Sequence, residues 1–178
     1  RSPAHAPAPA GVRELVQAAG EGFGPAGHAT TAMCLEMLDA LPAAEALDVG
    51  CGSGLLAQAW VALGRGRVLA CDLDPRAIDQ ASRSLVAAGR AGSVTLRRAP
   101  IAALEAGEIA GRVVLANIPA PAHASLLART GAPPCALVLS GLRPPEVPAV
   151  VDAWRGHGLE VRRRDARAGF VAVCMVGG

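Results

Sequence analysis

The sequence predicts a doubly wound α/β fold: a mostly parallel, seven-stranded sheet with helices on both faces and a C-terminal antiparallel hairpin. Short apolar runs alternate with helical patterns along most of the chain, and these runs are nearly continuous. Continuous apolar strands that alternate with helices are typical of a parallel sheet covered on both faces. The last two runs are joined by a short loop, so we expect an antiparallel strand at or near one edge.

The first half of the chain predicts three helices around two strands. Thr30 or Thr31 is the start signal of the first helix, and Gly64 closes the second. Asp74 and Pro75 form an N-cap and first-turn pair for the third. The expected elements are a helix at 31–41, a strand at 45–49, a helix at 53–63, a strand at 67–73 and a helix at 75–89.

The second half predicts three further strands and then the hairpin. Trp154 and the valines near it form the core face of the last helix. An arginine run at 162–164 lies beside the hairpin, and we interpret it as a solvated edge that discourages aggregation, with a nucleic-acid contact as the alternative. The expected elements are strands at 93–97, 112–117 and 135–141, helices near 100–107, 120–129 and 144–155, and the hairpin at 159–176.

Size and composition indicate one ordinary domain. The chain has 178 residues, and no apolar stretch approaches the roughly 20 residues that span a bilayer, so we expect a soluble, cytoplasmic monomer. A net charge of +2 calls for no nucleic-acid partner. The five cysteines include no close pair, which favours buried reduced thiols over a disulfide framework or a metal site. Residues 1–22 are Pro/Ala-rich and are interpreted as a lead or linker that can include a helix, ahead of a domain at 23–178.

The stretch LDVGCGSGLL places three glycines between the first strand and its helix. At Gly50, Gly52 and Gly54 the backbone must turn, and a ligand can approach without meeting a Cβ. Asp72 closes the second strand about 20 residues later, where a carboxylate can accept hydrogen bonds from both hydroxyls of a ribose. Leu55 occupies the third-glycine position of a dinucleotide fingerprint, which argues against a pyrophosphate ligand.

This D-x-G-x-G-x-G pattern resembles motif I of the class I S-adenosylmethionine-dependent methyltransferases, which have a Rossmann-like fold. The resemblance implies that the loop with Gly50 and Gly52 cradles the methionine and ribose of S-adenosyl-L-methionine. It also implies that Asp72 holds the ribose hydroxyls and that Leu73 lies against the adenine. A nicotinamide dinucleotide and a purely structural glycine turn are the alternatives.

Five stretches narrow the resemblance to one family. FGPAGHATTAMCLEMLDAL, LDVGCGSGLLA, CDLDPRAI, LANIPA and LVLSGL occur in the order and roughly the spacing of the ribosomal protein L11 methyltransferase family. That family trimethylates amino groups, and its signature is FGTG-x-H-x-TT, DVGCGSG, D-x-DP, ANI and SG. Position by position, its cofactor contacts fall on Thr31, Gly50, Asp72 and Asn117, and its closing loop falls on Phe23 and His28.

The sequence differs from the family signature in three places, and the match does not extend to the family's N-terminal domain. Pro25 and Ala26 replace the T and G of FGTG, and the ANI motif continues as Pro119-Ala120. The ending AGFVAVCMV lacks the family's tryptophan. The match also excludes the family's N-terminal domain, which grips the ribosomal protein, because only 22 residues precede Phe23. We therefore expect substrate recognition to be supplied upstream, taken over by a partner or lost.

Methyl transfer from a sulfonium ion is an in-line displacement that depends mainly on positioning and desolvation. Asn117 is the candidate catalytic residue, because an amide oxygen can accept an N–H from an incoming amine without adding charge. The carbonyl of Ile118 could accept another, and Pro119 stiffens that turn. Capping of the next helix is the alternative role of Asn117. Asp48 could orient the glycine loop or reach the methionine amine, and His28 could act as a base, although packing is the favoured interpretation of this histidine.

Three functions remain open on the sequence. The first is a methyltransferase that acts on a protein amine, with a ribosomal protein as the expected partner. The second is the same catalytic fold acting on a small molecule or on RNA. The third is a cofactor-binding module without catalysis. No metal is expected in any of them, and no membrane partner.

Overall fold

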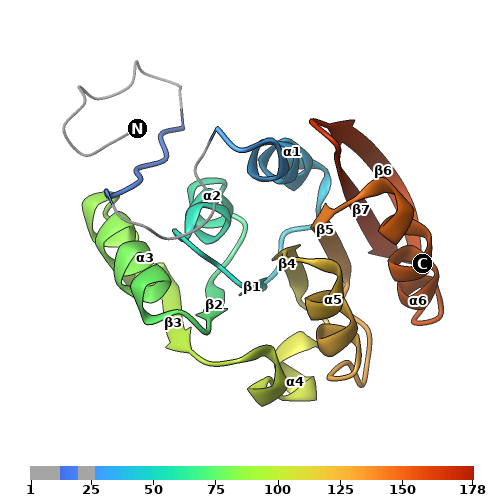
Figure 1. The fold of residues 1–178 in the computed structure, drawn as a ribbon. Helices are drawn as coiled ribbons and strands as arrows, with labels where there is room; N and C mark the ends of the chain where they lie inside the picture. The colour runs from blue at the N-terminus through green and yellow to red at the C-terminus, as the bar shows by residue number, and fades with distance from the viewer. Residues whose placement is uncertain (1–12, 20–26) are drawn as a thin grey trace.

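The seven strands form one mixed sheet in the order β3-β2-β1-β4-β5-β7-β6 in the computed structural model, which describes residues 13–19 and 27–178 (Figure 1). The first five strands are parallel, and β7 pairs antiparallel with both β5 and β6. The predicted doubly wound sheet with a closing hairpin is confirmed. The strands are β1 Ala46–Val49, β2 Val68–Asp72, β3 Val94–Arg98, β4 Val113–Asn117, β5 Ala136–Leu142, β6 Leu159–Arg167 and β7 Phe170–Gly177.

Helices cover both faces of the sheet. α1, α2 and α3 pack on one face, and α4, α5 and α6 pack on the other. Figure 1 shows α1 beside the β5–β7–β6 end of the sheet. The helices are α1 Ala29–Met37, α2 Leu55–Ala62, α3 Pro75–Ala87, α4 Ala106–Ile109, α5 Ala120–Leu127 and α6 Val147–Arg155, with short 3-10 turns η1 Leu38–Ala40, η2 Ala91–Ser93, η3 Ile101–Ala103 and η4 Pro144–Glu146.

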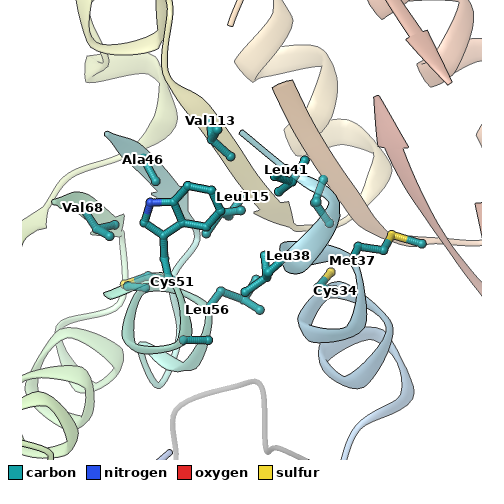
Figure 2. Close-up of a cluster of buried hydrophobic side chains, with 14 of the residues drawn as sticks. Cys34, Met37, Leu38, Leu41, Ala46, Cys51, Leu56, Val68, Val113 and Leu115 are labelled. Carbon is teal, nitrogen blue, oxygen red and sulfur yellow. The ribbon is translucent and has the colours of Figure 1, made fainter. Parts of the chain in front are cut away.

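The two faces explain why the strand sequences are nearly continuous apolar runs. In β4, Leu115 faces the cluster under α1 and α2, while Val114 faces the cluster under α5 and α6, and both are fully buried. Figure 2 shows the first cluster, in which Leu56 of α2 and Met37 of α1 lie over the strands. Because successive side chains point to opposite faces, a strand covered on both sides is apolar at most positions.

Two of the predicted helices, at 31–41 and near 100–107, differ from the structure. The α-helix expected at 31–41 starts at Ala29 and becomes a 3-10 turn after Met37. The helix expected near 100–107 is wrong: η3 and α4 replace it, and Glu105 between them caps α4 by exchanging hydrogen bonds with Glu108. Asp74 is confirmed as the N-cap of α3, since its side chain accepts a hydrogen bond from the Arg76 amide.

Residues 13–19 lie against α2 and α3 through buried polar side chains. Gln58 of α2 exchanges two hydrogen bonds with the backbone of Val16, and its amide nitrogen donates over 2.9 Å. The backbone of Ala18 is held in the same way by Gln80 at 2.8 Å and Ser84 at 3.0 Å, both in α3. Hydrogen bonds at both positions tie this segment to the domain. The boundary predicted at residue 22 lies outside the described residues and stays a prediction.

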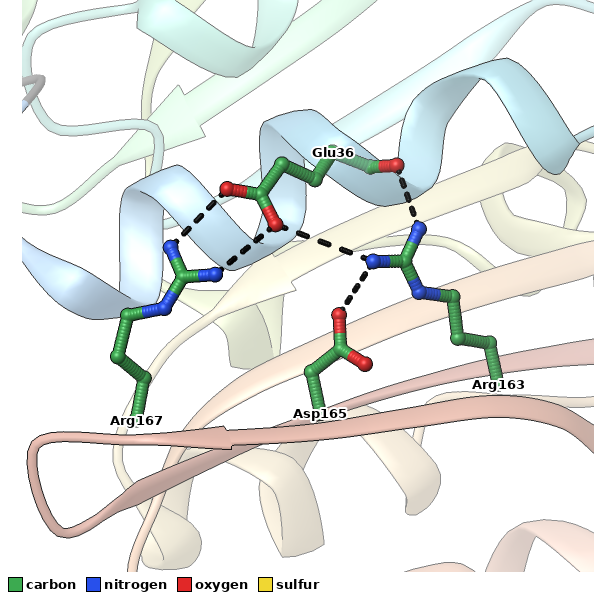
Figure 3. Close-up of polar contacts among 4 residues, drawn as sticks. All are labelled: Glu36, Arg163, Asp165 and Arg167. Atoms are coloured by element: carbon green, nitrogen blue, oxygen red, sulfur yellow. Dashed lines mark hydrogen bonds and ion pairs between the residues drawn. The ribbon is translucent and has the colours of Figure 1, made fainter.

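An ion-pair cluster joins α1 to the edge strand β6 (Figure 3). The Glu36 carboxylate accepts two hydrogen bonds from Arg167, at 3.0 and 3.1 Å. Arg163 donates to the Glu36 carbonyl over 2.9 Å and pairs with Asp165 at 2.5 Å. Part of the arginine run predicted to be a solvated edge therefore has a structural role, while Arg162 beside it is exposed.

The five cysteines, all within the described part of the chain, form no disulfide with one another. Burial raises the pKa of Cys34 to about 12 and that of Cys71 to about 11, so both are protonated near neutral pH. This favours packing over a reactive role. A search of the described residues for a helix long and apolar enough to cross a membrane finds none.

Candidate functional site

The glycine loop turns at the carboxyl end of β1, where the strand order reverses between β1 and β4. Gly50 has φ +65°, and a Cβ placed on it would lie 2.6 Å from Cγ2 of Ile118. Only glycine fits this close approach. The loop is held in place by the Cys51 amide, which donates to the Cys71 carbonyl over 3.0 Å. The backbone is thus drawn tightly against the loop that follows β4.

Asp72 is the half-buried carboxylate at the end of β2. One oxygen accepts a hydrogen bond from the Gly52 amide at 2.9 Å, and the other accepts one from the Asp74 amide, also at 2.9 Å. Each carboxylate oxygen has a second lone pair. Asp72 is therefore oriented by the backbone and keeps acceptor capacity for a pair of hydroxyl groups.

Asp48 lies beneath the loop and is 1% exposed. It accepts a hydrogen bond from the Ala57 amide in the first turns of α2 at 2.9 Å. Burial raises the pKa of Asp48 to about 7, with a smaller contribution from the negative charge of Asp72, while the Ala57 hydrogen bond acts in the opposite direction. Asp48 thus ties β1 to α2 beneath the loop, and its charge changes near neutral pH.

Asn117 at the end of β4 bridges to α1. Its Nδ2 donates to Oγ1 of Thr30 at 3.0 Å and lies 3.5 Å from Oγ1 of Thr31. Thr30 is in turn 2.8 Å from Nδ1 of His28. The residue at the N-cap of α5 is Pro119, so the alternative that Asn117 caps this helix is wrong. With Nδ2 directed at the threonines, Oδ1 is the polar atom of Asn117 left for a ligand.

Three adjoining hollows surround these residues. A cavity of about 60 Å³ lies between the glycine loop, Asp48 and Asn117. A second, of about 450 Å³, shares Gly50 and Asp72 with it and continues past Leu73 to Pro100 and Ile101. A third, of about 370 Å³, shares Asn117 and is lined by His28, Thr30, Ile118, Pro119, Gly141 and Phe170. Asn117 therefore stands between a cofactor-sized crevice and a separate hollow.

The structure brings most of the predicted site residues together. Thr31, Gly50, Gly52, Asp72 and Asn117 line the smallest cavity. Leu73 lines the second, with 65% of its surface exposed, an unusual state for a large apolar side chain. Phe23 lies outside the described residues.

Three residues of the site were not predicted. Thr30 was considered only as a helix start, yet it makes the shorter contact to Asn117. Gly141, with φ +82°, would bring a Cβ within 2.5 Å of the Ile118 carbonyl, and the SG motif was an available signal for it. Phe170 lines the third hollow from β7, and nothing in its local sequence indicates this position.

Comparison with known proteins gives the family. The model of the ribosomal protein L11 methyltransferase (PrmA) family matches residues 11–177. The chain belongs to this family. A ribosomal protein L11 methyltransferase of Syntrophotalea carbinolica is 40% identical over 157 residues, which are 82% of this chain and 50% of that protein. Its counterpart in Bordetella parapertussis is 43% identical over 143 residues, covering 76% and 45% respectively. The chain spans about half the length of the curated relatives it matches.

Solved structures of other methyltransferases have the same fold. The ribosomal protein L11 methylase of Lactobacillus delbrueckii subsp. bulgaricus superimposes with a TM-score of 0.81 at 19% identity, covering 99% of this chain and 93% of that one. A putative RNA methyltransferase of Pyrococcus horikoshii gives a TM-score of 0.68 at 17% identity, covering 84% and 81%. At these identities the likeness shows the fold alone. The predicted Rossmann-like methyltransferase fold is confirmed.

Proposed function

We propose that this chain is the catalytic domain of an S-adenosylmethionine-dependent methyltransferase that methylates amino groups of a protein, with ribosomal protein L11 as the first candidate substrate. Family membership supports the reaction type. The names of the relatives support the substrate. The site supports the reaction type, because a crevice that suits a nucleoside adjoins a second hollow at Asn117.

The crevice fits S-adenosyl-L-methionine in three respects. Gly50 packs against Ile118 and lines both hollows of the crevice, so its backbone is available to a ligand there. Asp72 would hold the ribose hydroxyls with its remaining lone pairs. Leu73, Pro100 and Ile101 line an apolar hollow that suits a flat purine. Thr31 and Gly52, with Asp48 below, would surround the methionine part.

The ligand supplies an electrophilic methyl group on a sulfonium ion. The chain contributes position and desolvation. Asn117 carries the proposal: its Nδ2 is engaged by Thr30, so its Oδ1 can accept an N–H of the entering amine and aim the lone pair at the methyl group. Ile118 lines the same third hollow, and its backbone carbonyl is the proposed second acceptor.

The test is calorimetric titration with S-adenosylmethionine and S-adenosylhomocysteine, with NAD as a control. We expect micromolar affinity for the first two and none for NAD. Asp72→Ala should lower both affinities at least tenfold, because it removes two charged hydrogen bonds to the ribose. Asp79→Ala is the matched control, since Asp79 is an exposed α3 carboxylate paired with Arg83. Equal affinity in Asp72→Ala and the wild-type chain would contradict the assigned site.

Methyl transfer is then measured with labelled S-adenosylmethionine and ribosomal protein L11. Incorporation into the protein supports the proposal. Incorporation into RNA or a small amine instead would favour the second function, and binding without any transfer would favour a cofactor-binding module. A cytoplasmic location and a monomeric state remain predictions.

A further inference from the structure

The third hollow, which we call the acceptor pocket, is closed on one side by Phe170. This residue begins β7 directly after the hairpin turn. Its ring meets the His28 ring edge-to-face, with 5.4 Å between centroids. Phe170 and His28 thus form one wall of the pocket, and Asn117 lies opposite on β4. The wall is built from two segments that are 142 residues apart (170 − 28) in the sequence.

Arg143 holds this wall from outside the pocket. Its guanidinium carbon lies 3.9 Å from the centroid of the Phe170 ring, which is cation–π distance. Nη1 also donates to the carbonyl of Gly169 over 3.3 Å. Within the described part of the chain, no ion pair includes the Arg143 guanidinium, and the Glu146 carboxylate contacts Arg143 at its backbone amide instead. Arg143 does not itself line the pocket.

The charges around the acceptor pocket favour a neutral ligand. Among the described residues that line it, none is an aspartate or glutamate. The carboxylate of Glu146, which accepts from the Arg143 amide, lines the hollow between α5 and α6 instead. Arg167 is paired with Glu36, and Arg163 with Asp165. The other charged or titratable groups near the site are His28 in the acceptor pocket, Arg143 behind Phe170, and Asp48, Cys51, Cys71 and Asp72 on the cofactor side.

We propose that Phe170 is a specificity-determining wall of the acceptor pocket, and that Arg143, stacked on its ring, favours entry of the acceptor amine in its neutral form. This inference rests on the proposed function. An ammonium ion would lose its water, find no carboxylate and meet the field of Arg143. A neutral amine keeps its lone pair and can donate N–H to Asn117.

The movement of charge during the reaction also favours a neutral acceptor amine. The nitrogen lone pair forms the N–CH₃ bond while the S–CH₃ bond breaks, and its electron pair stays on sulfur as a neutral thioether. The positive charge thus moves from sulfur to nitrogen. A methylammonium next to Arg143 is disfavoured and leaves, and it loses its proton to water outside the pocket. For a further round it must return as the neutral amine.

The experiment compares the wild-type chain with Arg143→Gln, using Arg162→Gln as the control. Arg162 is an exposed arginine of β6 away from the pocket. The acceptor is a peptide with one lysine and a blocked N-terminus, and kcat is measured from pH 6 to 10. Loss of the nearby cation raises the pKa of the bound amine, so the rising limb should move to higher pH and kcat at pH 7 should fall roughly threefold. Superimposable profiles for Arg143→Gln and Arg162→Gln would overturn the role of the charge.

The wall is tested separately with Phe170→Ala and Phe170→Trp. Phe170→Ala should raise KM for the peptide roughly tenfold and leave the affinity for S-adenosylmethionine unchanged, while Phe170→Trp should largely restore KM. An unchanged KM in Phe170→Ala would overturn the role of the wall. Cofactor titration of each variant verifies that the domain is folded. A wild-type chain that binds S-adenosylmethionine but methylates neither the peptide nor ribosomal protein L11 contradicts the proposed function itself.

Discussion

The cofactor side and the acceptor side of the site are assembled in different ways. The cofactor side comes largely from one stretch, from Asp48 to Asp74, in which the carboxylates of Asp48 and Asp72 accept hydrogen bonds from backbone amides. The acceptor side collects His28 and Thr30 before and within α1, Asn117 from β4 and Phe170 from β7. A local stretch can carry its own geometry, whereas a dispersed set depends on how distant elements pack.

Two residues join these halves. Ile118 packs against Gly50 on one side and lines the acceptor pocket on the other. Asn117 lines both the smallest cavity and the acceptor pocket. A change at Ile118 should affect both cofactor and acceptor binding, whereas truncation of Asn117 should act mainly on the acceptor side through loss of its Oδ1.

The largest effect is expected from Gly50→Ala. The new Cβ meets the Ile118 side chain at 2.6 Å with φ +65°, so the loop must move away from β4. We expect S-adenosylmethionine affinity to fall roughly 100-fold by calorimetry, as strain and displaced contacts add. Gly89→Ala is the control, because it has φ +67° and open space around its Cβ. Equal losses in the two variants would mean that backbone strain alone matters.

Asn117→Ala should separate binding from turnover. It removes the oxygen that orients the amine, so kcat is expected to fall roughly 100-fold. The affinity for S-adenosylmethionine should fall much less, since Asp72 and the glycine loop remain. Single-turnover rates and calorimetry on the same preparation measure the two quantities. A parallel loss of both would place Asn117 on the cofactor side alone.

Asp48→Asn tests how the buried carboxyl group beneath the glycine loop changes the stability of the domain with pH. The pKa of Asp48 is raised from 3.8 to about 7, so the folded chain holds this proton more tightly than the unfolded chain. The stabilisation from this carboxyl group is fully present below pH 4 and is lost as the pH rises through 7. The free energy of unfolding falls by roughly 4 kcal/mol at most as a result. Urea unfolding between pH 4 and 8 should show a smaller decline for Asp48→Asn than for the wild-type chain. Asp79→Asn should follow the wild-type curve.

The smallest effect is expected from Glu36→Gln, which weakens the link between α1 and β6. Arg167 lowers the pKa of Glu36, mainly through hydrogen bonds. The stabilisation is therefore present above the ordinary carboxyl pKa and is lost as the pH falls through the lowered value. Exposed ion pairs contribute little, so the melting temperature should change slightly, and less at high salt. A large loss of melting temperature in Glu36→Gln would show that α1 depends on this cluster for its position.

The local parts of the molecule were predictable from sequence. Apolar periodicity located the strands, and the Asp74-Pro75 pair located the start of α3. The helix expected near 100–107 failed because the chain forms the 3-10 turn η3 and then starts the separate short helix α4, capped at Glu105, which the apolar pattern cannot distinguish from one helix. Periodicity reports which face is buried, and it does not report where the backbone hydrogen bonds break.

The sequence by itself determined the doubly wound sheet, the glycine loop and the acidic strand end, because each depends on backbone preferences and spacings within a few tens of residues. Tertiary structure decided the insertion of β7 beside β5, the contact of Thr30 with Asn117, and the wall formed by His28, Phe170 and Arg143. These contacts join residues 27 to 142 positions apart (170 − 143 and 170 − 28). Local propensity carries no information on such pairs, since packing of the whole sheet brings them together.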